Sequence, residues 1–362
     1  MPSTDYDGSH FQDGDYAYRL NKDGTTVTVL DYSGTDSAVT IPALLGGYPV
    51  RCIGPSAFAG MLAITDVTVP DTVDQFYESA FSSCKNLATI NMPTSLKLID
   101  DFAFNDCSSL QSVVLPSGVT AINLYAFNLC TNLTSLTFNT GLTTIGAKAF
   151  FGCVKLSSAV LPDSLTKVGQ EAFSNCTGLV SLTLPAAATT YGDSVFSGCI
   201  GLTALNIQEG LINLGDYMFV GCTGLTAVSF PASLTSISKG AFGFCSSIEA
   251  ITTGSNIKSV LAYSFQSCTS LKRFYLTDSV TAVGISAFDG DVALKDIAIG
   301  SGIKTLYNNA FNNVSLQNIF VNLELSDWNK IVATNGLTIT GTPSVYYAGQ
   351  WSYVAGIATP NA

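Results

Sequence analysis

Residues 104–126 have the sequence FNDCSSLQSVVLPSGVTAINLYA, and this 23-residue stretch is one copy of a unit that fills most of the chain. Phenylalanine recurs at this spacing at twelve positions without an insertion: Phe58, Phe81, Phe104, Phe127, Phe150, Phe173, Phe196, Phe219, Phe242, Phe265, Phe288 and Phe311. Twelve copies in one register indicate a single supersecondary unit repeated along the chain, which is typical of a solenoid. The sequence therefore predicts one continuous array with capped ends, not several globular domains.

Within the unit, apolar residues follow the period of a short strand. Counted from Phe104, a cysteine falls at +3, aliphatic residues at +6, +9 and +11, proline at +12, and further aliphatic residues at +15 and +18. The alternation at Val113 and Leu115 is that of a strand, which Pro116 stops. We expect one short parallel strand per unit, a return leg around Ile122, and at most a turn or two of helix before the next phenylalanine.

Glycine recurs at +19 of several units, for example at Gly146, Gly169 and Gly215. Glycine is favoured where φ is positive and where neighbouring backbone segments approach closely. We expect one of these two causes to explain the recurrence.

The pattern Leu-x-x-Val-x-Leu-Pro-x-x-Val-x-x-Ile-x-x-x-Ala-Phe-x-x-Cys resembles the BspA-like leucine-rich repeat, also called the Treponema pallidum type. The resemblance covers about three quarters of the chain in twelve aligned copies. It implies a right-handed repeat solenoid with a parallel sheet on the concave face, mostly β with short turns of helix on the convex side. It also implies a surface-associated protein, since several members of that family are linked to attachment to extracellular matrix proteins.

Three segments are expected along the chain. Residues 1–53 form an N-terminal cap with a polar start, a hairpin around Asp23 and Gly24 and a degenerate repeat, residues 54–322 form the array of about twelve units, and residues 323–362 form a C-terminal cap. The last segment loses the period and is rich in aromatic residues: Trp328, Tyr346, Tyr347, Trp351 and Tyr353. We expect these rings to seal the core of the last coil, which would otherwise face water.

Nine of the ten cysteines form a ladder of their own with the same spacing, and Cys52 stands outside it. The ladder consists of Cys84, Cys107, Cys130, Cys153, Cys176, Cys199, Cys222, Cys245 and Cys268. Disulfides and a string of metal sites are the alternatives to buried free thiols. Side chains stacked one coil apart point the same way, which is unsuited to disulfide geometry, and no histidine, carboxylate or C-x-x-C accompanies them. We expect free thiols, no metal and no cofactor.

Charge and hydropathy limit the classes of partner. The net charge is −11 and the chain has only 15 Lys and Arg residues, which are scattered, so nucleic acid and anionic lipid are not expected as partners. No apolar run reaches 18 residues, so membrane insertion is not expected either.

Few residues are suited to catalysis. The only histidine is His10, which removes the histidine-dependent triads and most zinc-hydrolase arrangements. Acidic residues such as Asp71, Asp163 and Asp278 follow the strand of their unit along one edge, where a solvated rim is the simpler interpretation than a pair of facing glycosidase acids. No P-loop motif occurs. We expect a protein that is not an enzyme.

The outward side chains of each strand fall at +8 and +10 because +9 and +11 point into the core. In the first nine units these positions carry small and almost uncharged residues, whereas the twelfth unit would place Ile319 and Val321 there. A face of this kind is where a solenoid usually binds its partner.

The tenth unit breaks this pattern and supplies the candidate ligand-binding residues. Arg273 and Tyr275 bring a guanidinium and an aromatic ring onto the strip, with Lys272 beside them and Glu249 and Thr252 one unit earlier. Arginine and tyrosine are the residue types most often found as interface hot spots. Ordinary surface variation within a repeat is the alternative explanation.

The leading hypothesis is a non-catalytic binding or adhesion module that recognises a protein or glycan of a host or neighbouring cell. A structural scaffold or spacer is the alternative, and a carbohydrate-active enzyme is a weaker one. The start MPSTDYDGSHFQDGDY has no basic segment followed by an apolar one, so it contains no signal peptide. We expect an extracellular or cell-surface protein whose leader was removed; the alternative is an intracellular protein.

Overall fold

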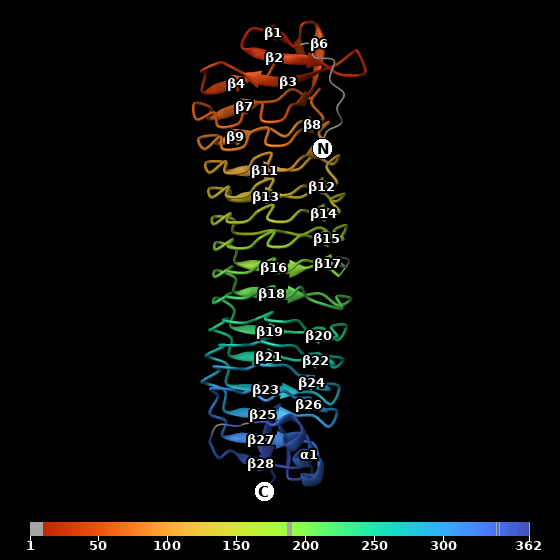
Figure 1. Cartoon of the computed structure of the whole chain (residues 1–362), viewed down its shortest axis with the longest axis vertical. Coiled ribbons are helices and arrows are strands. Elements are labelled where there is room, and N and C mark those ends of the chain that lie inside the picture. Colours follow the sequence, from red (N-terminus) through yellow and green to blue (C-terminus); the bar gives the residue numbers. More distant parts are fainter. Residues whose placement is uncertain (1–9, 187–189, 338, 340, 362) are drawn as a thin grey trace. The chain divides into compact units, whose positions relative to one another are not determined.

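The computed structural model describes residues 10–186, 190–337, 339 and 341–361. The chain divides into two compact units, Met1–Leu179 and Val180–Ala362. Each unit is a repeat solenoid of short strands, in agreement with the fold class predicted from the sequence (Figure 1). The single helix among the described residues is α1 (Leu325–Asn335).

The described residues of the first unit form fifteen strands. They are β1 (Phe11–Asp13), β2 (Tyr16–Leu20), β3 (Val27–Tyr32), β4 (Ala38–Thr40), β5 (Leu44–Leu45), β6 (Tyr48–Ile53), β7 (Asp66–Thr68), β8 (Gln75–Phe76), β9 (Thr89–Ile90), β10 (Leu98–Ile99), β11 (Ser112–Val114), β12 (Ala121–Ile122), β13 (Ser135–Thr137), β14 (Thr144–Ile145) and β15 (Lys167–Val168).

The second unit contains the remaining strands and the helix. The strands are β16 (Ser181–Leu184), β17 (Thr190–Tyr191), β18 (Ala204–Ile207), β19 (Ala227–Ser229), β20 (Ser236–Ile237), β21 (Ala250–Thr252), β22 (Ser259–Val260), β23 (Arg273–Leu276), β24 (Ala282–Val283), β25 (Asp296–Ile299), β26 (Thr305–Leu306), β27 (Asn318–Val321), β28 (Ser344–Tyr346), β29 (Trp351–Val354) and β30 (Ile357–Pro360).

Each typical coil contributes two strands to two parallel stacks. We call the strands that carry the +8 to +11 residues front strands; in the second unit they pair as β16–β18, β19–β21 and β23–β25–β27–β28. The return leg expected from the sequence is itself a two-residue strand that pairs with the next return leg, as in β20–β22–β24–β26. Its second residue is a buried aliphatic, so both stacks enclose one core.

The segments before and after each phenylalanine are hydrogen-bonded turns. Left-handed φ angles occur two residues before and two residues after the ring, as at Tyr125 (54°) and Leu129 (57°) around Phe127. Such residues interrupt a right-handed helix, so the short helical turns expected here are limited to single i→i−3 bonds such as Asn128 N–H to Tyr125 O (3.1 Å).

The recurrent glycine at +19 is explained by close packing. A Cβ on Gly146 would lie 2.6 Å from the carbonyl carbon of Asn123, and one on Gly169 would lie 2.4 Å from the amide nitrogen of Ala147. Neither glycine has a positive φ. Of the two causes considered from the sequence, the approach of neighbouring coils is therefore the one that applies.

The phenylalanines form stacked rows in the core of each unit. Ring centroids of successive residues lie 5.0–5.4 Å apart from Phe58 to Phe173 in the first unit. The spacing is 5.3–5.8 Å from Phe196 to Phe311 in the second. These rings are at most 2% exposed, so the constancy of the phenylalanine has a structural cause.

All ten cysteines are buried and have free thiols, as the ladder predicted. A ladder thiol contacts the carbonyl oxygen of a phenylalanine 26 residues earlier, for example Cys107 Sγ to Phe81 O (3.1 Å) and Cys245 Sγ to Phe219 O (3.1 Å). Burial raises the pKa of Cys245 to about 12. The thiols act as small packing groups with one weak hydrogen bond each.

The twelfth coil contains a one-residue deletion. It lies between Phe311 and β27, so the regular phenylalanine spacing does not reveal it. Strand β27 pairs with β25 at a separation of 22 residues, with Asn318 beside Asp296 and Phe320 beside Ala298. The outward positions are therefore Asn318 and Phe320, and the prediction of Ile319 and Val321 was wrong.

The N-terminal segment begins with the expected hairpin. Strands β1, β2 and β3 are antiparallel, with Asp23 and Gly24 in the β2–β3 turn, and β3 then pairs in parallel with β6. The hairpin of β5 and β6 is the insertion in the degenerate repeat. The division of the chain at residues 53 and 322 stays a prediction.

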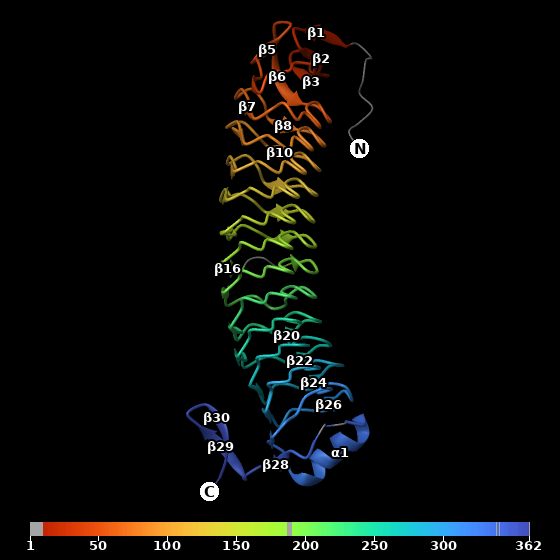
Figure 2. The ribbon, with the colours of Figure 1, turned by 90° about the vertical axis from the view of Figure 1, so that its left-hand side faces the viewer.

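The C-terminal segment covers the last coil in two different ways. Trp328 on α1 is 4% exposed, and β28 adds to the front strands beside β27, so both lie over the end of the coils. Trp351 and Tyr353 belong instead to the β29–β30 hairpin, which lies on the side of the front strands (Figure 2). The expectation that all the rings seal the core was therefore wrong for these two.

Candidate binding surface

The outward side chains of β16, β18, β19 and β21 form what we call the open strip. It consists of Ser181, Thr183, Ala204, Asn206, Ala227, Ser229, Ala250 and Thr252, and every one of these residues is exposed. A shallow hollow of roughly 430 Å³ runs across these strands. The strip carries no charged residue, so it offers hydroxyl, amide and methyl groups to a partner.

The open strip ends at a charged margin. Lys272 Nζ lies 2.6 Å from the Glu249 carboxylate, and both side chains are more than half exposed. An exposed ion pair of this kind contributes little to stability, so the pair is better regarded as a surface feature than as a structural link. Thr252 lies at the end of β21 and is exposed.

Arg273 occupies the first outward position of β23 and is half-buried. Its guanidinium forms no hydrogen bond and no ion pair with any residue of the described part of the chain. Asp296 is its neighbour in the parallel register, but the carboxylate of Asp296 accepts a hydrogen bond from Asn318 Nδ2 (2.8 Å). Arg273 thus presents several N–H donors beside the strip.

Tyr275 occupies the second outward position of β23, but it is half-buried beneath the C-terminal hairpin. Its hydroxyl accepts a hydrogen bond from the Ala358 N–H (3.2 Å), and its ring meets that of Tyr353 edge to face at 5.5 Å. The sequence placed this ring on an open strip, and the structure shows it covered.

The hairpin is fixed by an apolar cluster on the next two front strands. Ala298 and Phe320 are each 1% exposed and pack with Ala358. The Trp351 ring lies 5.6 Å from that of Phe320, and its Nε1 donates to Val321 O (3.2 Å). We call these front strands, β23, β25 and β27, the covered strip.

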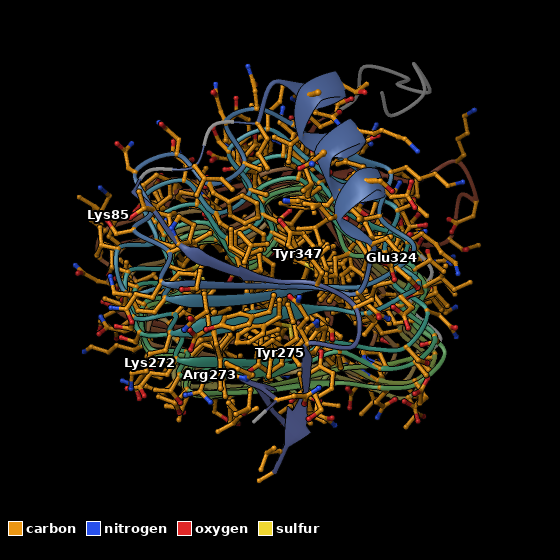
Figure 3. The ribbon with its side chains drawn as sticks, turned by 90° about the horizontal axis from the view of Figure 1, so that it is seen from below. Lys85, Lys272, Arg273, Tyr275, Glu324 and Tyr347 are labelled. Atoms are coloured by element: carbon orange, nitrogen blue, oxygen red, sulfur yellow. The ribbon has the colours of Figure 1, made fainter. Side chains whose placement is uncertain are left out.

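The predicted site residues are only partly brought together. In Figure 3, Lys272, Arg273 and Tyr275 lie along one side of the coils, the side on which the hairpin lies. Lys272 contacts Glu249, whereas Tyr275 faces the hairpin. A binding role for these residues and for Thr252 stays a prediction.

The sequence prediction missed the packing of Phe320 against Trp351 and Ala358. The signal for Phe320 was available, because Leu316 stands five residues after Phe311 where earlier units have the aliphatic at six. The positions of Trp351 and Ala358 could not be deduced, since they lie outside the period.

The rim acids have structural partners. Asp71 accepts hydrogen bonds from the N–H and hydroxyl of Thr94 (2.9 and 3.0 Å), one coil later. Asp278 accepts hydrogen bonds from the N–H of Ser301 (2.6 Å) and from the side chain of Asn322, which lower its pKa. These carboxylates cap the turn of the following coil and do not face another acid across a cleft.

No group of three or more His, Cys, Asp or Glu side chains suited to a metal ion occurs in the part of the chain that the structure describes. No described helix is long and apolar enough to span a bilayer.

Comparison with known families gives a match over most of the repeats. A family model described as "BspA type Leucine rich repeat region (6 copies)" matches residues 51–180, 143–272 and 258–334. No match was found among curated proteins.

Solved structures give matches along nearly the whole chain. A leucine rich cell surface protein from Faecalibacterium prausnitzii is 30% identical, with a TM-score of 0.58, over 92% of this chain and 99% of that protein. A leucine-rich repeat protein from Bacteroides ovatus is 26% identical, with a TM-score of 0.62, over 94% and 100% of the two chains. The pneumococcal vaccine antigen PcpA, 18% identical with a TM-score of 0.57 over 93% and 98%, supports the fold alone.

Proposed function

Because the chain belongs to the BspA-type leucine-rich repeat family, we propose that it is a non-catalytic binding module of a surface or secreted protein. Its partner is a protein or glycan of a host or neighbouring cell. Leucine-rich repeat proteins of bacterial surfaces support binding or adhesion as the general role.

The observation that carries this proposal is the border between the open strip and the covered strip. Eight exposed, uncharged residues end at a guanidinium that has no partner among the described residues. A partner on the strip would make hydrogen bonds with the hydroxyls and amides of β16 to β21 and a charge-assisted bond with Arg273. Arginine is one of the residue types most enriched at interface hot spots.

An extracellular or cell-surface location belongs to the same proposal. The relative from Faecalibacterium prausnitzii is described as a cell surface protein. Adhesion would require the strip to meet macromolecules outside the cell, and its exposed hydroxyl and amide groups are open to such a partner.

The experiment is a binding screen against a panel of extracellular matrix proteins and a glycan array, followed by variants that block the strip. Ala227→Arg with Ala250→Arg adds two bulky cations at exposed positions, and Arg273→Glu reverses the charge at the margin. Thr223→Arg, at an exposed turn position before β19, is the matched control. We expect at least about tenfold weaker binding for the double variant and for Arg273→Glu, and no change for the control.

A spacer is the second candidate function, and the lack of charged groups on the open strip favours it. Absence of any saturable partner in both panels would support the spacer. Binding that survives the blocking substitutions would contradict the placement of the site on the open strip.

A further inference from the structure

An exposed phenylalanine stands in the second unit at a position where the fold does not require one. Phe244, two residues after the buried Phe242, is 52% exposed and has a left-handed φ of 61°. Ten of the twelve coils have glycine, serine, asparagine or aspartate at this position. A bulky residue is strained in a left-handed conformation. An unneeded strain of this kind indicates a function.

The Phe244 ring is directed to solvent and not to a neighbouring ring. No described aromatic ring stacks on it. Leu129, the other bulky residue at this position, lies instead against the next coil, where a Cβ on Gly152 would be 2.9 Å from its Cδ2. An exposed aromatic side chain without a partner is a feature of interaction surfaces.

The preceding coil has a bare spot at the same position. We call residues 216–221 the first turn and residues 239–244 the second turn; the N–H of Gly221 donates to Gly243 O (2.8 Å), so the two turns are adjacent. Gly221 takes the place of Phe244 in the first turn. A Cβ on Gly221 would meet nothing closer than the backbone of Gly198, at 4.0 Å.

The two turns also carry opposite charges at one position. Asp216 begins the first turn, and Lys239 takes its place in the second. Both are half-buried. The Lys239 ammonium lies 5.5 Å from the centre of the Tyr217 ring and forms no ion pair with a described carboxylate. The turns thus differ in both shape and charge, each time in the complementary sense.

A two-fold axis that runs along the coils between the two turns would use this complementarity. Such an axis places each residue of one turn opposite the equivalent residue of the other turn in a second copy. Phe244 then faces Gly221, and Lys239 faces Asp216. Both contacts occur twice because the interface is isologous.

A tyrosine stands at the position of this axis. The Tyr217 ring occupies the space that a Cβ on Gly240 would need, so it lies between the first and the second turn. The two-fold operation brings the Tyr217 ring of the second copy to the same place. Pairs of aromatic rings stabilise such a contact.

We propose that these turns are a contact between two copies of the chain, whose coils stack in opposite directions. Phe244 of each copy packs on Gly221 of the other, and Lys239 of each pairs with Asp216 of the other. A second copy is the partner because the two turns complement each other. The contact leaves the front strands, and with them the open strip, unused. Its small size predicts a weak dimer with a Kd of about 10–100 μM.

Sedimentation velocity of the whole chain from about 1 to 500 μM tests the dimer. Phe244→Asn should weaken dimerisation at least about tenfold without lowering the urea midpoint, since Asn175 has a φ of 60° at the same position of its coil. Ile212→Ser is the control, because Ile212 is 57% exposed on the return leg, away from the turns. A monomer at every concentration, or a dimer unaffected by Phe244→Asn, would overturn the proposal.

Charge reversal distinguishes a contact between copies from one within a chain. Lys239→Asp places two carboxylates opposite each other, and Asp216→Lys places two ammonium groups, so each variant alone should stay monomeric. The fold tolerates such changes, since Ala262 occupies the same position one coil later.

An equimolar mixture of the two charge variants should form a heterodimer with nearly the native Kd. Each contact in that heterodimer joins one lysine to one aspartate, whereas a pair broken within one chain would not be restored by mixing. Dimers of either variant alone, or no dimer in the mixture, would overturn the proposal.

Discussion

The open strip and the covered strip occupy the same register of the same repeat, yet one faces solvent and the other lies under a hairpin. In β18 the outward residues are Ala204 and Asn206, both exposed. In β27 they are Asn318 and Phe320, of which the second is 1% exposed. The repeat fixes the backbone and the core in both strips. Whether solvent or the hairpin lies over a strip depends on its outward residues, which the core does not constrain.

The covered strip and the hairpin need each other. Tyr275 and Phe320 would expose aromatic rings on a sheet face if nothing lay above them. A two-stranded hairpin such as β29–β30 is only marginally stable on its own in water. Each part therefore supplies the apolar surface that the other requires.

The largest effect is expected from removing an aromatic ring that the covered strip has and the open strip lacks. Phe320→Ala should lower the free energy of hairpin opening by about 3–5 kcal/mol, because it leaves a cavity between Ala298 and Trp351. Hydrogen exchange of residues 351–360 measures this opening. Asn206→Ala, at the matching position of the open strip, should change stability by no more than about 0.5 kcal/mol. Similar effects of the two substitutions would contradict the distinction.

The core beneath the covered strip also breaks the period, at Asp291. This residue takes the place of a ladder cysteine, is fully buried and accepts the Cys268 N–H (2.7 Å), while its other carboxylate oxygen has no hydrogen-bond partner among the described residues. Burial raises the pKa of Asp291 well above its ordinary value. Asp291→Cys should therefore stabilise the second unit at pH 7 by about 1–3 kcal/mol in urea unfolding.

The pH dependence provides the check on Asp291. A folded pKa above the unfolded one means that its contribution is complete below the unfolded pKa of about 3.9 and is lost as the pH rises through the folded pKa. The advantage of Asp291→Cys should hence shrink as the pH falls toward about 4. An advantage independent of pH would show that ionisation of Asp291 is not the cause.

A smaller effect is expected from Tyr275→Phe, which keeps the ring contact with Tyr353 and removes the acceptor of the Ala358 N–H. The loss of one hydrogen bond should lower the free energy of hairpin opening by about 1 kcal/mol. Thr252→Val, at the same position of the neighbouring open coil, is the control and should leave the hairpin unchanged. Faster exchange in both variants would indicate a general loosening of the coils.

The smallest effect is expected at the border itself. Lys272→Ala breaks the exposed pair with Glu249 and should change the urea midpoint by an amount equivalent to less than about 1 kcal/mol. Glu249→Ala should give the same result. A loss of several kcal/mol in either variant would make this margin a structural element of the solenoid.

The coils could be predicted because every core position repeats. Phenylalanine, cysteine and the aliphatic residues recur at fixed offsets, and the buried side chains of the structure follow them. The covered strip could not be predicted in the same way. The deletion before β27 leaves the phenylalanine register intact, so it is easily overlooked. The hairpin comes from the C-terminal segment, which has no repeat, so its packing on the front strands could not be deduced from residue spacing. The candidate binding residues stay a prediction: Arg273 lies at the outward position that the sequence indicated, but the cover over Tyr275 was not foreseen.

Hydrogen exchange of the intact chain, followed by mass spectrometry of the peptide that spans residues 351–360, measures directly whether the hairpin covers the front strands. Because an isolated hairpin is marginally stable, slow exchange there requires docking on β23, β25 and β27. We expect strong protection of these amides in the native chain and loss of that protection in Phe320→Ala. Exchange as fast as that of an unstructured peptide in the native chain would show that the strip is not covered.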